Sequence, residues 1–278
     1  MYKIIIDSCG ELPQNLKEDS HFCNVALSLD IDGEIIMDDE NFDQKSFLAK
    51  VKSCIAGPKS ACPSPESFIE EITEAEHIYI VTLSGELSGS YNSAVLAKNI
   101  YEEEHEQDKK IYVFNSKSAS IGETIIGMKI QELEEAGLDF DEVVAQTEEY
   151  INSMNTFFVL ETLETFVKTG RLSRLKGRIV ETLNIKPIMA STETGYIRML
   201  SQARGMKKAL SKMVDEMVKH TKNCEQKIIA ISHCNCPERA QYVKELIEKV
   251  CHFKDILVLD TRGVSSMYAN DGGIIIAV

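Results

Sequence analysis

The amino-acid sequence predicts an α/β protein of two domains. The first, over residues 1–152, has a parallel sheet built from βαβ units, and the second, over residues 153–278, has a mixed sheet. Short apolar runs alternate with amphipathic stretches in the first half, which is typical of a parallel sheet. The second half contains a hairpin pattern among its helices, and a hairpin requires antiparallel pairing. The chain of 278 residues is long enough for two ordinary domains.

In the first half, the expected strands are short apolar runs that end in polar residues. They are residues 3–7, 77–83 and 109–116, with a hairpin of residues 24–31 and 34–37 around Asp32-Gly33. Apolar residues at helical spacing predict helices over residues 42–54, 67–75, 91–104 and 118–136, the last closed by Gly137. The segment 57–65 contains three prolines and is expected to be a loop.

In the second half, apolar runs predict strands over residues 156–162, 227–233, 255–261 and 272–278. A hairpin is expected over residues 185–202, with its turn at residues 193–195. Amphipathic spacing predicts helices over residues 203–222 and 238–250. The mixture of hairpin and helices indicates a sheet with both parallel and antiparallel neighbours.

The composition excludes several classes of protein. The formal net charge of −14 disfavours duplex DNA or an anionic membrane surface as a partner, because both need a broad basic surface. No stretch reaches the ~18 apolar residues of a membrane-spanning helix, and the first residues lack the pattern of a signal peptide. The eight cysteines include no CxxC pair. We therefore expect a cytoplasmic protein with reduced thiols, no nucleic-acid partner and no integral membrane segment.

Residues 81–99, VTLSGELSGSYNSAVLAKN, place serines and glycines at a strand-to-helix junction. The first N–H groups of a helix lack partners within the helix, and the helix dipole is positive there. Together with these N–H groups, the hydroxyls and flexible glycines predict a nest for a phosphate or carboxylate, formed by Ser84, Gly85, Ser88, Gly89 and Ser90. The alternative is a helix N-cap preceded by a turn that the glycines permit.

Hydroxyl groups also follow the ends of other expected strands. They belong to Ser8, Ser116, Ser118 and Ser120, while the proline-containing loop adds Ser60 and Ser64. The carboxyl ends of parallel strands meet at one edge of a sheet, where ligands bind. We therefore expect these hydroxyls, that of Ser116 included, to face one crevice that recognises a single oxyanion or an uncharged rim.

The serine-rich junction is a poor match to known catalytic motifs. Residues 85–89 read GELSG, which is not the GxSxG nucleophile elbow. A catalytic triad also needs a histidine, and among the six histidines only His233 follows an expected strand. The sequence contains no P-loop, and no GxGxxG follows a strand. A serine-dependent acyl- or phosphoryl-transfer enzyme is therefore the second hypothesis rather than the first.

The segment SHCNCPE, residues 232–238, brings together three residue types that bind metals, in His233, Cys234 and Cys236. Their spacing matches no common zinc pattern, and no fourth ligand is near them in the sequence. A turn that leads into a helix at Pro237 is the favoured interpretation. We expect no metal site and no cofactor.

Five basic residues gather within residues 166–179 of an otherwise acidic protein, namely Lys168, Arg171, Arg174, Lys176 and Arg178. One interpretation is a solvated basic face. The other is that one or two arginines approach the crevice and hold a second anion such as a phosphoryl group, with Arg204 joining them. The residues alone leave both interpretations open.

Seven blocks of the chain, taken in order, resemble the DegV family: IIIDSCGELP, SACPSPESF, LSGELSGSYNSA, NSKSASIGE, LETLETFVKTGRLS, LNIKPIM and RGMKKAL. The resemblance spans nearly the whole chain. It implies a two-domain α/β protein that binds a long-chain fatty acid between its domains and performs no chemistry itself. It also implies a possible partner, a separate fatty acid kinase that uses ATP to convert the presented carboxylate to an acyl phosphate.

The resemblance further implies which residues contact the carboxylate. Motif by motif, the hydroxyls of the family's upstream block fall on Ser60 and Ser64, and the serine of its L-S-G-T block falls on Ser88. Gly89 is intact in that block, and Ser90 stands for its threonine. This agrees with an anion nest for the head group and an apolar slot for the tail.

Two arginines and three departures complete the resemblance. Arg171 and Arg204 match family arginines expected near the transferred phosphate or the kinase contact. Tyr268 replaces a histidine of the head-group network, Asp271 replaces a proline, and Ala61 replaces a serine. Tyr268 can still donate a hydrogen bond, but unlike histidine it does not titrate near neutral pH. The departures leave a third hypothesis open, a sensor of a small anionic metabolite.

Overall fold

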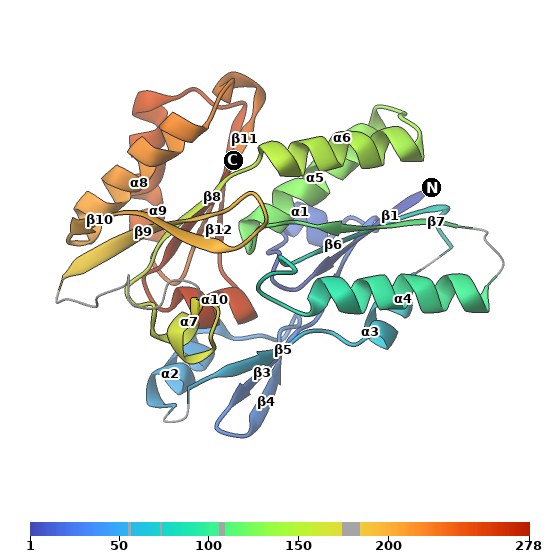
Figure 1. Cartoon of the computed structure of the whole chain (residues 1–278), viewed down its shortest axis with the longest axis horizontal. Coiled ribbons are helices and arrows are strands. Elements are labelled where there is room, and N and C mark those ends of the chain that lie inside the picture. The colour runs from blue at the N-terminus through green and yellow to red at the C-terminus, as the bar shows by residue number, and fades with distance from the viewer. Residues whose placement is uncertain (55–56, 73, 106–108, 174–183) are drawn as a thin grey trace.

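The computed structural model describes residues 1–54, 57–72, 74–105, 109–173 and 184–278. Its strands form three sheets, with four strands in the order β2-β1-β6-β7, six in the order β10-β9-β8-β13-β11-β12, and three in the order β4-β3-β5. Figure 1 shows the four-stranded and six-stranded sheets side by side, with the three-stranded sheet below them. The α/β class with a parallel and a mixed sheet is as the sequence predicts.

The four-stranded sheet is wholly parallel and contains β1 (Tyr2–Asp7), β2 (Phe22–Val25), β6 (His77–Thr82) and β7 (Lys110–Asn115). One face packs against α5 (Ile121–Glu135) and α6 (Phe140–Ser153), and the other against α3 (Pro65–Ile69) and α4 (Ser90–Glu104). Ile4 and Ile6 enter the first core and Ile5 enters the second, so all three are fully buried. Burial on both faces explains why β1 reads as an unbroken apolar run.

The six-stranded sheet contains β8 (Thr156–Val159), β9 (Ile185–Ser191), β10 (Ile197–Arg204), β11 (Ile228–His233), β12 (Asp255–Asp260) and β13 (Ile274–Ala277). Only β11 and β12 pair in parallel, and the other neighbours are antiparallel. Helices α8 (Met206–His220) and α9 (Pro237–Val250) cover one face. The chain passes from α6 to this sheet between Ser153 and Thr156, and we retain residues 152 and 153 as the proposed domain boundary.

Helix α5 joins the two large sheets. It contacts β1 and β6 of one and β11 and β13 of the other. Its Ile121 and Ile125 pack with Ala230 and Ala277 of the second sheet. Because Gly127 has no Cβ, α5 can approach β1 closely: a Cβ there would lie 2.7 Å from Ile6 Cδ1. The two sheets therefore share one buried helix rather than a flexible linker.

The third sheet differs from the sequence prediction. Strands β3 (Ser28–Ile31) and β4 (Glu34–Met37) form the expected hairpin, but β5 (Lys59–Ala61) lies within the expected loop and pairs with β3. The expected strand over residues 24–31 is divided between two sheets. The break lies at Leu27, whose N–H donates to Ser8 Oγ and whose carbonyl accepts from the Asp38 N–H, so the chain turns there.

Several helices also differ from the prediction. The helix expected from residue 203 begins at Met206, because Ala203 and Arg204 extend the β9–β10 hairpin and Gly205 has a φ of 83°. The helix expected over residues 67–75 is α3, and the one over residues 42–54 is α2 (Gln44–Ser53). The short helices that the sequence does not predict are α1 (Gln14–Lys17), α7 (Glu164–Lys168), α10 (Gly263–Ala269) and the 3₁₀ turn η2 (Cys224–Gln226), and the longer α6 was also missed.

Candidate ligand-binding site

A cavity lies between the parallel and mixed sheets and is lined by residues of both halves of the chain. The space between its atoms is about 830 Å³ when open solvent at its mouth is counted, but water-sized spheres can be centred in only about 90 Å³ of it. Most of its wall is apolar and comes from Leu27, Leu83, Leu87, Phe158, Leu160, Phe166, Ile197, Val264, Ala269 and Ile275. An apolar wall interrupted by a few polar groups is typical of a small-molecule site.

The loop after β6 forms one wall of the cavity, and Asp7 at the end of β1 fixes that loop. The Asp7 carboxylate accepts hydrogen bonds from the Leu83 N–H (2.9 Å) and from Ser90 Oγ. Ser88 lies between them, accepts from the Ser90 N–H at 3.2 Å, and lines the cavity. The Ser90 hydroxyl is therefore used inside the protein, whereas Ser88 faces the cavity.

Six polar side chains predicted from the sequence line this cavity, namely Ser60, Ser88, Ser118, Ser120, Arg171 and Tyr268. Their segments are in contact. The Arg171 Nε–H donates to the Leu87 carbonyl at 3.3 Å, and the Arg171 guanidinium carbon lies 6.0 Å from the centre of the Tyr268 ring. A Cβ built on Gly89 would lie 3.1 Å from Cys62 Sγ, so the strand of Ser60 passes close to the loop of Ser88.

The Tyr268 hydroxyl is buried and has no hydrogen-bond partner among the described residues. The Tyr268 ring lies 4.7 Å from the Phe166 ring, centre to centre, and both residues line the cavity. A buried hydroxyl without a partner is costly, by about 1–3 kcal/mol. A ligand oxygen within hydrogen-bond distance of the Tyr268 hydroxyl would remove this cost.

Comparison with known proteins assigns the chain to a family. The model of the DegV family, described as an uncharacterised protein family, matches residues 1–278. The chain belongs to the DegV family. It is 36% identical, over 99% of its length and 97% of the relative, to a DegV domain-containing protein of Streptococcus pneumoniae.

Two solved structures show how close the likeness is for this DegV protein. A DegV family protein of Ruminococcus gnavus, whose crystal structure contains vaccenic acid, is 50% identical with a TM-score of 0.96, covering 100% of this chain and 99% of that one. The fatty acid kinase (Fak) B3 protein of Streptococcus pneumoniae, loaded with linoleic acid, is 35% identical with a TM-score of 0.89, covering 99% and 98%.

The remaining predicted site residues of this DegV protein lie outside the cavity wall. Ser64 is exposed and caps α3 by accepting from the Ser67 N–H at 3.3 Å. Ser116 is buried, and its hydroxyl donates to the Ser118 carbonyl at 3.2 Å, which closes the turn after β7. Gly89 is the exposed N-cap of α4. Arg204 is exposed at the end of β10.

Ser118 and Ser120, which the rule on strand ends predicts at the crevice, also line the cavity. Outside the predicted set, the lining includes the hydroxyl-bearing residues Thr156, Ser191 and Ser265. Thr156 begins a strand of the other sheet, and Ser265 lies in α10, which has no amphipathic pattern. No feature of the sequence alone marks these two as neighbours of the cavity.

The turn from β6 also contacts the hairpin of the second sheet. Ser84 Oγ donates to the Gly195 carbonyl at 2.9 Å. Gly195 has a φ of 90°, and a Cβ there would lie 2.3 Å from Ser84 Oγ, so this close approach requires glycine. Gly195 lies in the turn between β9 and β10, where the sequence predicts it. The contact closes one side of the cavity.

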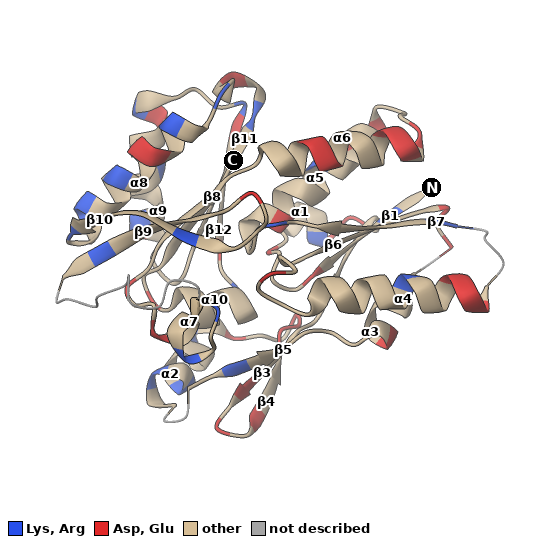
Figure 2. Ribbon diagram, viewed as in Figure 1, with Lys and Arg blue, Asp and Glu red and all other residues tan. Residues whose placement is uncertain are grey.

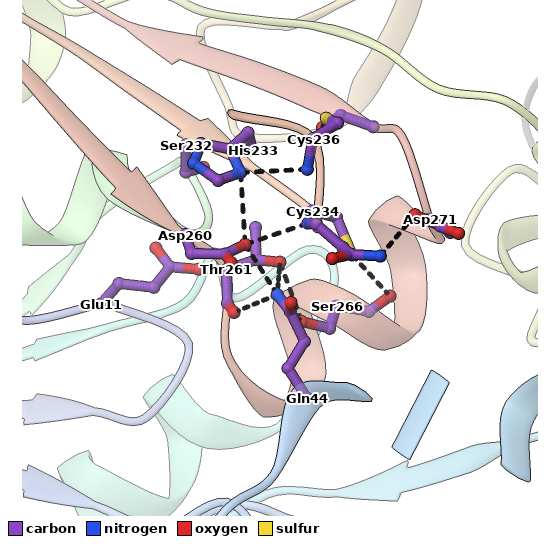
Figure 3. A network of polar contacts seen from close by, with 12 residues as sticks. Glu11, Gln44, Ser232, His233, Cys234, Cys236, Asp260, Thr261, Ser266 and Asp271 are labelled. Atoms are coloured by element: carbon purple, nitrogen blue, oxygen red, sulfur yellow. Dashed lines mark hydrogen bonds and ion pairs between the residues drawn. The ribbon is translucent and has the colours of Figure 1, made fainter. Parts of the chain in front are cut away.

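The SHCNCPE segment forms part of a polar network beside α10, which Figure 3 shows. His233 Nδ1 lies 3.3 Å from Asp260 Oδ1 and 3.3 Å from the Cys236 N–H, which donates to it. The sulfur atoms of Cys234 and Cys236 approach two different carbonyl groups, so they do not converge on one point. As expected, Pro237 is the first residue of α9.

The same network fixes α10, which carries Tyr268, against the first half of the chain. The Gln44 side-chain amide donates to Asp260 Oδ1 at 2.8 Å and to the Thr261 carbonyl at 2.6 Å (Figure 3). Asp38 Oδ2 accepts from the Val264 N–H at 3.0 Å, in the first turn of α10. These contacts hold one wall of the cavity in place from the segment between β4 and the first residue of α2.

Of the basic segment, Arg171 belongs to the cavity wall and Lys168 pairs with Glu164 on the surface of α7 at 2.7 Å. Arg174, Lys176 and Arg178 lie outside the described residues.

Figure 2 shows acidic residues on the β3–β4 hairpin and α6, with basic residues mixed among acidic ones on α8. Among the described residues, no helix has the length and apolarity to span a bilayer.

Proposed function

We propose that this DegV protein binds one long-chain fatty acid in the cavity between its sheets. The carboxylate is held by Ser60, Ser88 and Tyr268, and the hydrocarbon chain lies against the apolar wall. The observation that carries the proposal is the unpartnered, buried Tyr268 hydroxyl beside an apolar cavity. The fatty acids named for the two similar crystal structures, vaccenic and linoleic acid, support it.

The energetics of the cavity suit such a ligand. Each buried methylene contributes about 0.8 kcal/mol, so ten of them supply roughly 8 kcal/mol. The hydroxyls then fix the orientation of the carboxylate, at about 1.5–3 kcal/mol for a hydrogen bond to a charged group. The chain supplies affinity, and the polar end supplies specificity for an acid.

We further propose that the protein is a carrier without catalytic activity, and that it presents the carboxylate to a separate ATP-dependent kinase. The printed name of the Streptococcus pneumoniae structure, a fatty acid kinase protein, supports this partner. No histidine is among the described residues that line the cavity, so Ser88 has no such base beside it. Arg171 at the cavity and Arg204 on the surface are the residues we assign to the phosphate or kinase contact.

A cytoplasmic location follows from this proposal, because the kinase needs ATP. The eight free cysteines are in keeping with reduced thiols. The bound fatty acid is the only ligand that the proposal requires, with no metal or organic cofactor.

Lipid extraction of the purified protein tests the first proposal. We expect mass spectrometry to find about one acyl chain per protein, and added vaccenic acid to raise the melting temperature of the delipidated protein. At a ligand concentration 100 times Kd, the stabilisation is about 2.7 kcal/mol. An extract without acyl chains, together with an unchanged melting temperature, would contradict fatty acid binding. Hydrolysis of an ester that Ser88→Ala abolishes would favour the transfer enzyme, and a water-soluble anion in the extract would favour the sensor.

The carrier role needs a second test. Loaded protein is mixed with a purified fatty acid kinase and ATP, and acyl phosphate is measured. We expect Arg204→Ala to bind vaccenic acid as the unaltered protein does but to reduce acyl phosphate formation. Lys249→Ala, on the exposed end of α9, is the control. Equal product formation with all three proteins would contradict the assignment of Arg204.

A further inference from the structure

Four carboxyl groups lie behind the cavity wall and take no part in the proposed ligand contacts. Asp7, Glu11, Asp38 and Glu123 are 0 to 3% exposed. Among the described residues, no ion pair joins any of them to a lysine or arginine. An isolated buried charge is very unfavourable, so such groups give up their charge unless hydrogen bonds stabilise it.

Asp7 has the hydrogen bonds that an ionised carboxylate needs. It accepts from the Cys9 N–H at 3.1 Å, from the Leu83 N–H at 2.9 Å, and from Ser90 Oγ. The last two bonds hold both ends of the loop that carries Ser88. The position of Ser88 in the cavity therefore depends on Asp7.

Glu123, in the first turn of α5, has no N–H or hydroxyl donor among the described residues, and the Cys9 thiol beside it is only a weak donor. Both of its carboxyl oxygens are buried and lack a partner among the described residues. One oxygen of Glu123, one of Asp7 and the sulfur of Cys9 all lie within 4.8 Å of one another. An ionised Glu123 would face the charge of Asp7 without compensation, whereas a neutral Glu123 has an O–H group that can donate to it.

We propose that Glu123 keeps its proton at neutral pH and donates a hydrogen bond to the Asp7 carboxylate. Glu123 is then a positioning residue for the loop that holds Ser88. This proposal goes beyond fatty acid binding. Only its functional consequence, the positioning of Ser88 for a ligand, rests on the proposed function. It places a single proton at the base of the proposed head-group site.

The other groups around Glu123 bear on this assignment. Burial raises the pKa of Asp7 as well, but the hydrogen bonds that Asp7 accepts from Ser90, Leu83 and Cys9 lower it, and Glu123 has no such set of bonds. Burial, followed by the negative charge of Asp7, raises the pKa of Glu123 well above its usual range. Burial also raises the pKa of the Cys9 thiol, so Cys9 is neutral, and it raises the pKa of Glu11 to about 8. From β11 and α10, the groups that face the cluster are the hydroxyls of Ser232 and Ser265.

The proton has a consequence for stability. The folded protein holds it at pH values where the unfolded chain, with an ordinary glutamate, has released it. The free energy of unfolding therefore falls as pH rises above about 4.5, until Glu123 ionises in the folded state. One such proton changes the unfolding equilibrium constant tenfold per pH unit.

The substitution Glu123→Gln tests the proposal on lipid-free protein, because the glutamine amide can donate to Asp7 at every pH. Glu135→Gln, at the exposed end of the same helix, is the matched control. We expect the infrared absorption of protonated carboxyl groups to lose one band in Glu123→Gln, with the band of Glu11 remaining, and to be unchanged in Glu135→Gln. In urea unfolding between pH 5 and 8, the unfolding equilibrium constant should rise with pH less steeply in Glu123→Gln than in the unaltered protein. The difference should be a factor of ten per pH unit.

Two results would overturn the proposal. One is an infrared spectrum and a pH dependence that are the same in Glu123→Gln as in the unaltered protein, which would mean that Glu123 is ionised. The other is a stoichiometric divalent metal ion, found by elemental analysis of the unaltered protein and absent from Glu123→Gln. If Glu123→Gln fails to fold, infrared titration of Glu11→Gln, which lacks the other carboxyl group that holds a proton at neutral pH, gives the same decision.

Binding of linoleic acid at different pH values tests the positioning role. We expect affinity to fall as the Glu123 band, which is the band absent from Glu123→Gln, disappears from the spectrum of the unaltered protein, and to change less than twofold over the same range in Glu123→Gln. A constant affinity while the band disappears would overturn the positioning role. If linoleic acid binds at no pH, fatty acid binding fails, while the infrared and unfolding results still decide the state of Glu123.

Discussion

The serines after β6 and the serines after β7 look alike in the sequence but have different partners in the structure. Ser118 Oγ lies 2.6 Å from Thr156 Oγ1, and Ser120 Oγ donates to the Glu11 carboxyl at 2.9 Å. Ser88 Oγ, by contrast, accepts a hydrogen bond from Ser90 and faces the cavity. The serines after β7 also line the cavity, but their hydroxyls are paired within the protein, that of Ser118 with Thr156 and that of Ser120 also with Ser232 of β11. Ser88 has an O–H group to offer a ligand.

The largest expected effect is that of pH on stability. It comes from Glu11, which accepts a hydrogen bond from Ser120 after β7. Burial raises the pKa of Glu11 from 4.5 to about 8. The folded state thus binds a proton that the unfolded chain releases, and stability should fall as pH rises from about 4.5 to about 8. Urea unfolding at several pH values measures this. Glu11→Gln should reduce the slope by one proton, and an unchanged slope would mean that Glu11 is ionised in the fold.

Ser88→Ala should produce the next largest change, in affinity rather than stability. The loss of a hydrogen bond to a carboxylate costs about 1.5–3 kcal/mol, which is tenfold to hundredfold in Kd. Calorimetric titration with vaccenic acid measures the loss, and the melting temperature of the lipid-free protein should hardly change. Ser53→Ala, at the exposed end of α2, is the control. Equal affinities of the two variants would show that Ser88 does not contact the carboxylate.

Ser118→Ala should behave in the opposite way. It leaves the buried Thr156 hydroxyl without its partner, which costs about 1–2 kcal/mol of stability. The affinity for vaccenic acid should stay within about threefold, because the Ser118 hydroxyl is already paired inside the protein. Unfolding and binding measured on the same sample give both values. A large loss of affinity with full stability would place Ser118 among the ligand contacts.

The smallest effect, and the most specific one, is expected for Tyr268→Phe. It removes a buried hydroxyl without a partner, so the lipid-free protein should become more stable by about 1 kcal/mol. The affinity for vaccenic acid should fall by a few-fold, because the same hydroxyl gains a partner on binding. Tyr242→Phe is the control, since its hydroxyl lies 3.1 Å from Ser211 Oγ. A destabilised lipid-free Tyr268→Phe protein would show that the hydroxyl already has a partner.

Much of the fold follows from the sequence because its signals are local. The apolar run of β1 and the turn at Gly195 are both read from neighbouring residues. The division of residues 24–31 between two sheets is not local, since it depends on the contacts of Leu27 with Ser8 and Asp38. Strand β5 likewise exists only because β3 lies beside it.

The candidate site is predictable to a similar extent. The rule that parallel strands end at one edge places Ser88, Ser118 and Ser120 near the cavity. The residues alone also suggest Ser60 and an arginine of the basic segment, and the family resemblance singles out Arg171 and adds Tyr268. Neither signal separates Ser88 from Ser64, because a serine before a proline at a helix start reads the same whether it caps the helix or binds a ligand. Only the hydrogen-bond partners of each hydroxyl, which are set by tertiary packing, make that distinction.

A crystal structure of the protein with vaccenic acid tests the central claim most directly. The account predicts the carboxylate within hydrogen-bond distance of Ser88 Oγ and of the Tyr268 hydroxyl, with the chain along the apolar wall between the sheets. A carboxylate bound away from both hydroxyls, or an acyl chain outside the cavity, would contradict it.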